Sequence, residues 1–349
     1  MNKVTSLYDI SWQCSEEEYR ADPAYSYSTI ARFNREGFEN LNKVFTRIDS
    51  PSLTFGSMVD TLLTGTEEEF DNKFEVALLP DISDNLALIT KILFDLCHET
   101  YTNLESIPDN IISTIAQENG YYANSKYAQY RVKKIKEECN DYYDLLFLCC
   151  SNKTLVSAED YQSAGRCVER LKTCEATKWY FESDNPFESI QRFYQLKFKG
   201  SYEDISLRCM ADQIIVNHSD KTIIPCDLKT TSSPEWVFYK SFYKWGYWIQ
   251  AQLYWYIIRQ NLDKDPLYKD YKLLDYRFIV INRYTLQPLI WIYPDTQAIT
   301  DCTYGENHQY KCRNWRNIVK ELNYYLTSNS ILPMGISTIN DIKEWLNKE

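Results

Sequence analysis

The chain has 349 residues, of which 49 are Asp or Glu and 38 are Lys or Arg, so its formal net charge is -11. This length allows one large domain or two smaller ones, each with its own hydrophobic core. The acidic balance excludes a protein that coats nucleic acid with an extended basic surface. It does not exclude a small cleft in which a metal ion and a local basic patch contact phosphate.

The cysteines and the opening residues indicate a protein of a reducing compartment. The 11 cysteines include no Cys-x-x-Cys pair, so we interpret them as small core residues rather than as ligands of an iron–sulfur cluster. The first residues lack the apolar segment of a signal peptide, and no run reaches the roughly 18 apolar residues of a membrane span. We expect a cytoplasmic protein without a membrane partner, located in the host cytoplasm if a phage encodes it.

The first half of the chain predicts mainly helices. A loose lead-in over residues 1–20 precedes a short helix from Tyr27, with Ser28 as its candidate N-cap. The next helical pattern covers residues 53–63, and in it Asp60 falls on a different face from its apolar neighbours. Further helical patterns cover residues 86–96, 107–117, 127–150 and 161–181. We expect residues 1–185 to form a mainly helical portion that covers one side of a cleft.

The densest basic cluster of the chain lies within the longest of these helical patterns. It consists of Arg131, Lys133, Lys134 and Lys136. Such a cluster is usually a solvated helix face, and the alternative is a contact with a phosphate backbone.

The second half predicts an α/β domain over residues 186–349, integrated with the helical portion. Strand patterns and helical patterns follow the order β-β-β-α-β-β, and a helix closes the chain. This order favours a mixed central sheet of about five strands flanked by helices. The strands are expected at 190–198, 206–217, 222–231, 276–283 and 288–293, and the helices at 234–259 and 310–326.

Two acids and a lysine occupy adjacent apolar runs of this domain. Asp212 precedes one run, a polar turn follows, and the next run ends in Asp227-Leu228-Lys229. This pattern is typical of a β-hairpin, and Asp227 and Lys229 share a face because they are two residues apart on a strand. Carboxylates hold hard divalent metals, and such metals activate water for attack on phosphodiesters. The simpler alternative is a salt bridge that only stabilises the strand, with Lys229 at a sheet edge and Asp212 as a turn acid.

These residues, with Gln250 and Tyr254 on the following helix, resemble the PD-(D/E)XK nuclease superfamily. Within it the chain is similar to the RecB-like branch and to the exonuclease VIII (RecE-like) group of phages and prophages. The motif stands here as Asp212, then DLKTT from Asp227, then Gln250 and Tyr254. Looser similarity extends over residues 25–295 and includes the segments YSYSTIARF and FGSMVDTLL.

The resemblance implies a Mg²⁺- or Mn²⁺-dependent deoxyribonuclease with two-metal-style hydrolysis. It implies an exonuclease that acts on the ends of double-stranded DNA in recombination or DNA processing. A single-strand annealing protein is an expected partner, and a homo-oligomer is known among relatives. The implied catalytic residues are Asp212, Asp227, Lys229 and Gln250; the implied metal ligands are Asp212, Asp227, the Leu228 carbonyl and Asp60; Glu188 and Tyr254 are possible additions.

The pattern departs from the family in ways that leave alternatives open. Asp60 stands where many relatives carry a metal-binding His, although Asp also provides oxygen ligands. Gln250 can be read as a helix-surface amide, and Tyr254 as core packing. A catalytically inactive binding or assembly protein of the same fold therefore remains an alternative, as does an endonuclease or an RNA-directed nuclease. The three histidines are scattered, and no GxxxxGK[ST] loop is present, so a motor ATPase is excluded.

Overall fold

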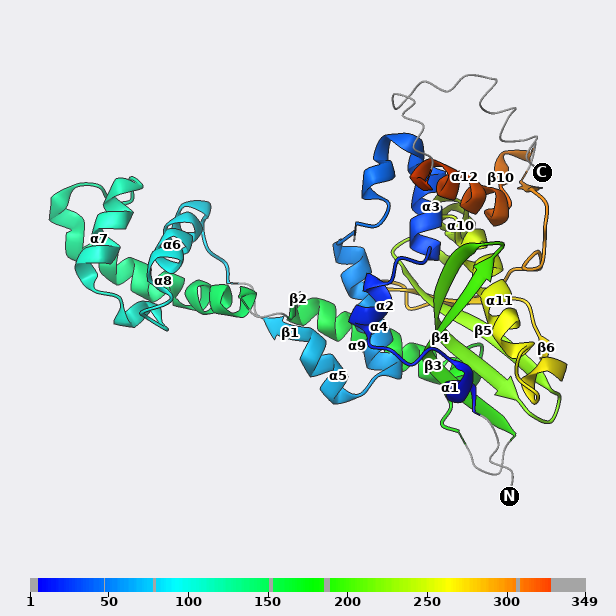
Figure 1. The fold of residues 1–349 in the computed structure, drawn as a ribbon. Coiled ribbons are helices and arrows are strands. Elements are labelled where there is room, and N and C mark those ends of the chain that lie inside the picture. Colours follow the sequence, from blue (N-terminus) through cyan, green and yellow to red (C-terminus); the bar gives the residue numbers. More distant parts are fainter. Residues whose placement is uncertain are drawn as a thin grey trace. The chain divides into compact units, whose positions relative to one another are not determined.

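The structure is a computed structural model, and it describes residues 6–46, 48–77, 80–150, 153–184, 189–305 and 308–327. Its contacts divide the chain into two compact units (Figure 1). We name Met1–Gly56 with Cys167–Glu349 the sheet unit, and Ser57–Arg166 the helical unit. This division differs from the boundary expected at residue 185, because N-terminal residues such as Ile30 and Phe33 share a hydrophobic core with the sheet.

The sheet unit is built on a mixed sheet of six strands in the order β3-β4-β5-β7-β8, with β6 beside β5. The pairs β5–β7 and β5–β6 are parallel, and the remaining pairs are antiparallel. The predicted α/β class with a mixed central sheet is therefore confirmed. The strands are β3 (Ile190–Tyr202), β4 (Ile205–Asn217), β5 (Thr222–Thr231), β6 (Lys272–Leu273), β7 (Arg277–Asn282) and β8 (Pro288–Ile292).

Helices cover both faces of this sheet. Because β5 and β7 are parallel, the chain between them makes a crossover, which carries α10 (Phe238–Trp245) and α11 (Tyr247–Leu262). α11 packs on β3 and β4, and it is apolar on most sides because α3 (Tyr27–Glu36) and α12 (Trp315–Thr327) also contact it. The other face meets the turn η4 (Lys178–Phe181), where the main-chain oxygen of Tyr180 accepts a hydrogen bond from Gln213.

Three sequence predictions in the sheet unit were wrong. The first 20 residues contain α1 (Leu7–Ile10) and α2 (Glu16–Ala21), because capping boxes at Ser6 and Ser15 satisfy their first amide groups. The closing helix begins at Trp315 instead of residue 310, since β10 (Tyr310–Cys312) pairs with β9 (Cys302–Tyr304). The N-cap of α3 is Ser26 rather than Ser28. The unit also contains the short turns η1 (Gly37–Lys43), η5 (Glu235–Val237) and η6 (Tyr268–Asp270).

The helical unit has its own hydrophobic core. The helices α6 (Asp84–Cys97), α7 (Asp109–Glu118) and α8 (Ala128–Cys149) enclose it, close to the predicted positions. A parallel pair, β1 (Phe74–Ala77) with β2 (Thr154–Ser157), was not predicted. The other elements of the unit are α5 (Glu67–Lys73), η2 (Leu104–Ser106) and η3 (Ser125–Tyr127). Two helices, α4 (Pro51–Thr64) and α9 (Ala158–Thr173), have residues in both units.

The basic cluster of α8 is not a bare cationic surface. Arg131 is buried at 2% exposure. Lys133 and Lys134 pair with the glutamates four residues further along the helix, and Lys136 pairs with Asp109. Each cation of the cluster is thus neutralised or used in packing, which favours the structural interpretation over a phosphate contact.

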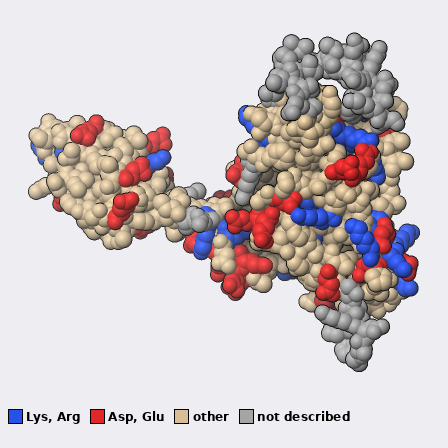
Figure 2. All heavy atoms as spheres, viewed as in Figure 1, with Lys and Arg blue, Asp and Glu red and all other residues tan. Residues whose placement is uncertain are grey.

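The net charge is concentrated in the helical unit. Its sequence contains 19 Asp and Glu against 9 Lys and Arg, a formal charge of -10, whereas the sheet unit has 30 against 29, a charge of -1. Figure 2 shows Asp and Glu side chains on the visible face of the helical unit. The acidity of the whole chain therefore does not describe the sheet unit. Among the described residues, no helix is long and apolar enough to cross a membrane.

Candidate active site

Asp212 lies where β4 and β5 stop pairing. Their register ends at the Gln213–Cys226 pair, one position before Asp212 would face Asp227. There the main-chain N–H of Leu228 donates to Oδ2 of Asp212 at 2.9 Å. The Asp212 carboxylate thus accepts the hydrogen bond that a main-chain carbonyl of β4 would otherwise accept. Asp212 and Asp227 come together at the point where the two strands separate.

The pairing of β4 with β3 is also interrupted at Asp212. Tyr194 and Leu196 of β3 keep their partners in β4, but the register omits Gln195, the residue opposite Asp212. Gln195 has a positive φ of 52°, a conformation that is uncommon for a residue with a side chain. Distortions of this kind re-aim side chains and concentrate at functional sites. The pairing of β4 with both of its neighbours is therefore interrupted at its acidic residue.

Asp227 is 1% exposed, and different donors engage its two oxygens. Nε2 of Gln250 donates to Oδ1, and Nζ of Lys229 lies 2.5 Å from Oδ2. Asp227 and Lys229 share a face of β5, and α11 brings Gln250 to that face. The structure therefore joins three of the predicted catalytic residues at one buried carboxylate, with Asp212 beside them.

Lys229 is held in its charged form. Burial by itself lowers the pKa of an ammonium group, but the negative charges of Asp227 and Asp212 outweigh burial and raise the pKa of Lys229. The Lys229 ammonium thus lies beside Asp227, where it can orient a water molecule or neutralise charge on a phosphate.

Four tyrosines, which we name the tyrosine arc, line this site: Tyr27, Tyr247, Tyr254 and Tyr276. Their rings follow one another from Tyr247 to Tyr27, Tyr254 and Tyr276, with centroid separations of 6.4, 6.5 and 6.2 Å. Nζ of Lys229 lies 4.8 Å from the centroid of the Tyr247 ring. Burial raises the pKa of all four phenols, so at neutral pH each can donate a proton in a hydrogen bond but carries no charge.

The residues at the centre of the site fit a hard divalent cation. Asp212, Asp227 and the Leu228 carbonyl would hold it, and a cation at Asp227 would compete with the Lys229 ammonium. Oε1 of Gln250 is buried without a hydrogen-bond partner among the described residues, which is the environment of a missing ligand or water. No group of three His, Cys, Asp or Glu in the described ranges is placed to hold a metal. Water would therefore supply further ligands, as Mg²⁺ commonly requires.

The junction of α10 and α11 positions both Tyr247 and Gln250. Gly246 ends α10 with a φ of 72°, in the left-handed region, and the next residue starts α11. A Cβ atom at Gly246 would lie 3.3 Å from Cδ1 of Ile249 and 3.6 Å from Cβ of Ala31. Only glycine adopts this conformation without strain, so the turn fixes where the two site residues point.

Gly246→Ala is expected to lower the free energy of unfolding by about 1–2 kcal/mol, because alanine is strained in the left-handed region. Urea unfolding measures the change. Gly165→Ala is the control, since Gly165 lies within α9 and an added Cβ there meets no atom within 4 Å. That variant should be neutral or stabilising. Equal effects of the two substitutions would contradict a special role of the Gly246 turn.

The remaining predicted residues have different outcomes. Tyr254 is buried in α11 and belongs to the tyrosine arc. Asp60 belongs to the helical unit, where its Oδ1 accepts a hydrogen bond from Thr64 at 3.5 Å, and its role as a metal ligand stays a prediction. Glu188 lies outside the described residues.

Sequence reasoning missed Tyr27, Tyr247, Tyr276 and the distortion at Gln195. The tyrosines carry no motif, and the only signal was the count of 29 tyrosines in the chain. Tyr27 starts α3, far from β5 in sequence, and only the packing of α3 on α11 brings it to the site.

Comparisons with known proteins do not establish a family for this chain. No family model and no curated protein matches the chain. A solved structure from Eubacterium rectale, named "Putative exonuclease", is 16% identical and has a TM-score of 0.41, over 82% of this chain and 80% of its own. Similarity at this level does not establish a shared activity, and membership of the PD-(D/E)XK superfamily stays a prediction.

Proposed function

We propose that the sheet unit is a metal-dependent deoxyribonuclease of the PD-(D/E)XK type. The observation that carries this proposal is the cluster of Asp212, Asp227, Lys229 and Gln250 at the point where β4 and β5 separate. In its finer form the protein is an exonuclease that acts on the ends of double-stranded DNA, as the sequence resemblance implies.

The roles of the residues follow from their chemistry. Asp212 and Asp227, with the Leu228 carbonyl, would hold Mg²⁺ or Mn²⁺, which supplies charge stabilisation and a more acidic water when bound. Lys229 carries a positive charge next to these acids and would neutralise charge that develops on the phosphate. The amide of Gln250 fixes the orientation of Asp227 through its hydrogen bond and leaves Oε1 available to a water.

The near-neutral charge of the sheet unit supports DNA as its substrate. The net charge of the whole chain, -11, suggests long-range repulsion of the phosphate backbone. The sheet unit, with 30 acidic and 29 basic residues, does not produce such repulsion. Local cations can therefore contact phosphate without an opposing field from the same unit. The assignment to phage-type recombination, a single-strand annealing partner and a homo-oligomer rests on the sequence resemblance.

A cleavage assay with Lys229→Ala tests this proposal. Purified protein is incubated with linear, circular and nicked DNA, with Mn²⁺ or with a chelator. We expect Mn²⁺-dependent cleavage that falls about 100-fold or more in Lys229→Ala, the scale on which a charge-stabilising group contributes to catalysis. Lys272→Ala, an exposed lysine in β6 of the same sheet, should retain full activity.

The substrate forms distinguish the finer proposal from its alternatives. Degradation of linear but not circular DNA supports an exonuclease, and cleavage of circular DNA supports an endonuclease. Absence of Mn²⁺-dependent cleavage, or equal cleavage by Lys229→Ala, would overturn the enzymatic proposal in favour of a binding or assembly protein.

A further inference from the structure

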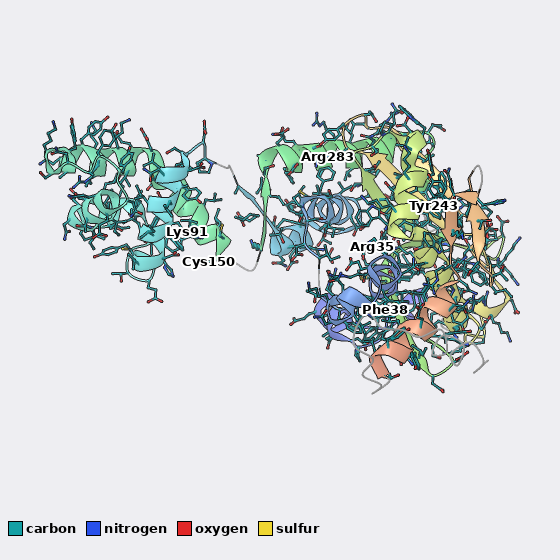
Figure 3. The ribbon with its side chains drawn as sticks, turned by 90° about the horizontal axis from the view of Figure 1, so that it is seen from above. Arg35, Phe38, Lys91, Cys150, Tyr243 and Arg283 are labelled. Carbon is teal, nitrogen blue, oxygen red and sulfur yellow. The ribbon has the colours of Figure 1, made fainter. Side chains whose placement is uncertain are left out.

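Trp245 is an exposed tryptophan with two cations at its ring. Its side chain is 40% exposed. Nζ of Lys244 lies 4.8 Å and Cζ of Arg35 lies 5.2 Å from the centroid of the ring. Arg35, on α3, is labelled in Figure 3, together with Tyr243 of α10, the helix that ends in Trp245.

A short chain of contacts links this ring to the candidate active site. The hydroxyl of Tyr27 donates to the main-chain oxygen of Trp245 at 2.9 Å. The ring of Tyr27 lies 6.4 Å from that of Tyr247, which in turn contacts Lys229. Trp245 and Tyr247 also flank the Gly246 turn. Trp245 is therefore exposed to solvent and is joined to the tyrosine arc through Tyr27 and the Gly246 turn.

The surroundings of Trp245 are basic. Lys240 and Lys244 are four residues apart on α10 and share a face, and within the described ranges neither has an acidic partner. On α3, Arg32 and Arg35 both pair with Glu36, which leaves an excess of one positive charge. An aromatic face among cations is the combination that binds the bases and the backbone of single-stranded nucleic acid.

We propose that Trp245 is a stacking platform for an unpaired base of single-stranded DNA, with Lys244 and Arg35 beside the backbone phosphates. The face of a base within a duplex is covered by its neighbours, so only an unpaired base can stack on an exposed indole. Lys244 is held to the Trp245 ring by one weak cation–π contact. When a base stacks on the ring, the Lys244 ammonium can turn to a backbone phosphate instead. The assignment to the substrate path rests on the proposed function, whereas the binding requires neither metal nor cleavage.

Equilibrium binding of a fluorescein-labelled oligothymidylate to the full chain tests the proposal. Fluorescence anisotropy is recorded in a chelator, so that no cleavage occurs. Trp245→Ala is expected to raise Kd about 10-fold, as the loss of one stacked base does, while Trp245→Phe raises it less. Lys244→Ala should weaken binding and lower the dependence of Kd on salt concentration by about one phosphate contact.

The matched control is Tyr127→Ala in the helical unit. Tyr127 is 39% exposed, and Nζ of Lys126 lies 4.8 Å from its ring, so the local contact resembles that of Trp245. It belongs to a unit with a charge of -10, so its removal should leave Kd unchanged.

Several outcomes would overturn the assignment. These are an unchanged Kd in Trp245→Ala, an equal loss in Tyr127→Ala, or an equal effect on a blunt duplex of the same length. If Trp245→Ala fails to fold, Trp245→Phe and Lys244→Ala decide the same question. Because the measurement is made without metal, a protein that binds through Trp245 but does not cleave DNA would contradict the proposed nuclease and leave this platform intact.

Discussion

Asp227→Ala is expected to abolish cleavage and to lower the free energy of unfolding by about 3 kcal/mol. Asp227 is 1% exposed and Lys229 is 19% exposed, so removal of the carboxylate leaves an ammonium without its partner in a largely buried position. The side-chain amide of Gln250 loses its acceptor at the same time. An unpaired buried charge is among the most destabilising changes that a single substitution can make.

The double variant Asp227→Leu/Lys229→Met separates stability from function. Replacement of both members of a buried ion pair by apolar residues of similar size is often neutral or stabilising, because two desolvation penalties disappear together. We expect its free energy of unfolding to return to within about 1 kcal/mol of the original protein. It should remain inactive, because both the carboxylate and the ammonium are absent.

Urea unfolding, followed by tryptophan fluorescence, and the cleavage assay provide the two readouts. Lys272→Met, at an exposed position, is the control for the apolar substitution. It should change neither the free energy of unfolding nor the rate of cleavage. Cleavage by the double variant would contradict the catalytic role of the pair. A double variant as unstable as Asp227→Ala would contradict the view that the unpaired Lys229 charge is the source of the instability.

The central strands could be predicted from the sequence because their apolar runs are continuous. β5 was predicted at the observed bounds, Thr222–Thr231, since a polar turn precedes a run that is buried on both faces. The side chains of Asp227 and Lys229 could be placed on one face from the two-residue period of a strand alone. The ion pair between them is the direct consequence.

The rest of the candidate site depends on contacts that no local pattern encodes. The positive φ of Gln195 is a local distortion of the backbone within β3, and the surrounding sequence, QRFYQLKF, predicts an unbroken strand. The tyrosine arc assembles residues of α3 and α11 with Tyr276, the residue before β7, and only the packed structure brings them together. Regular elements are thus visible in the sequence, whereas irregularities and long-range neighbours are not.

The net charge was misleading for a related reason. A sum over the whole chain averages a helical unit of charge -10 with a sheet unit of charge -1. The field that a substrate meets is set by the charges nearest to it, because screening limits their range to about 8–10 Å at physiological salt. The objection to DNA binding therefore applies to the helical unit and not to the surface around Trp245.

Arg131→Met is expected to destabilise the helical unit by about 3 kcal/mol, although the sequence places Arg131 in a cluster of surface cations. The guanidinium is buried and donates to Oγ of Ser113 at 3.0 Å, to Oε1 of Gln117 at 2.8 Å and to the main-chain oxygen of Tyr122 at 2.7 Å. Methionine fills part of the volume but leaves these acceptors without a donor.

Hydrogen exchange measured by mass spectrometry distinguishes this role from that of a surface charge. Amides of α7 and α8 should exchange faster in Arg131→Met, whereas those of β4 and β5 should not change. Lys133→Met is the matched control, because Lys133 is 72% exposed and its Nζ lies 3.6 Å from Glu137. Such a pair contributes only about 0.3–0.5 kcal/mol. Equal protection in the two variants would show that Arg131 is not a structural cation, and faster exchange in β4 and β5 would show that the two units do not unfold independently.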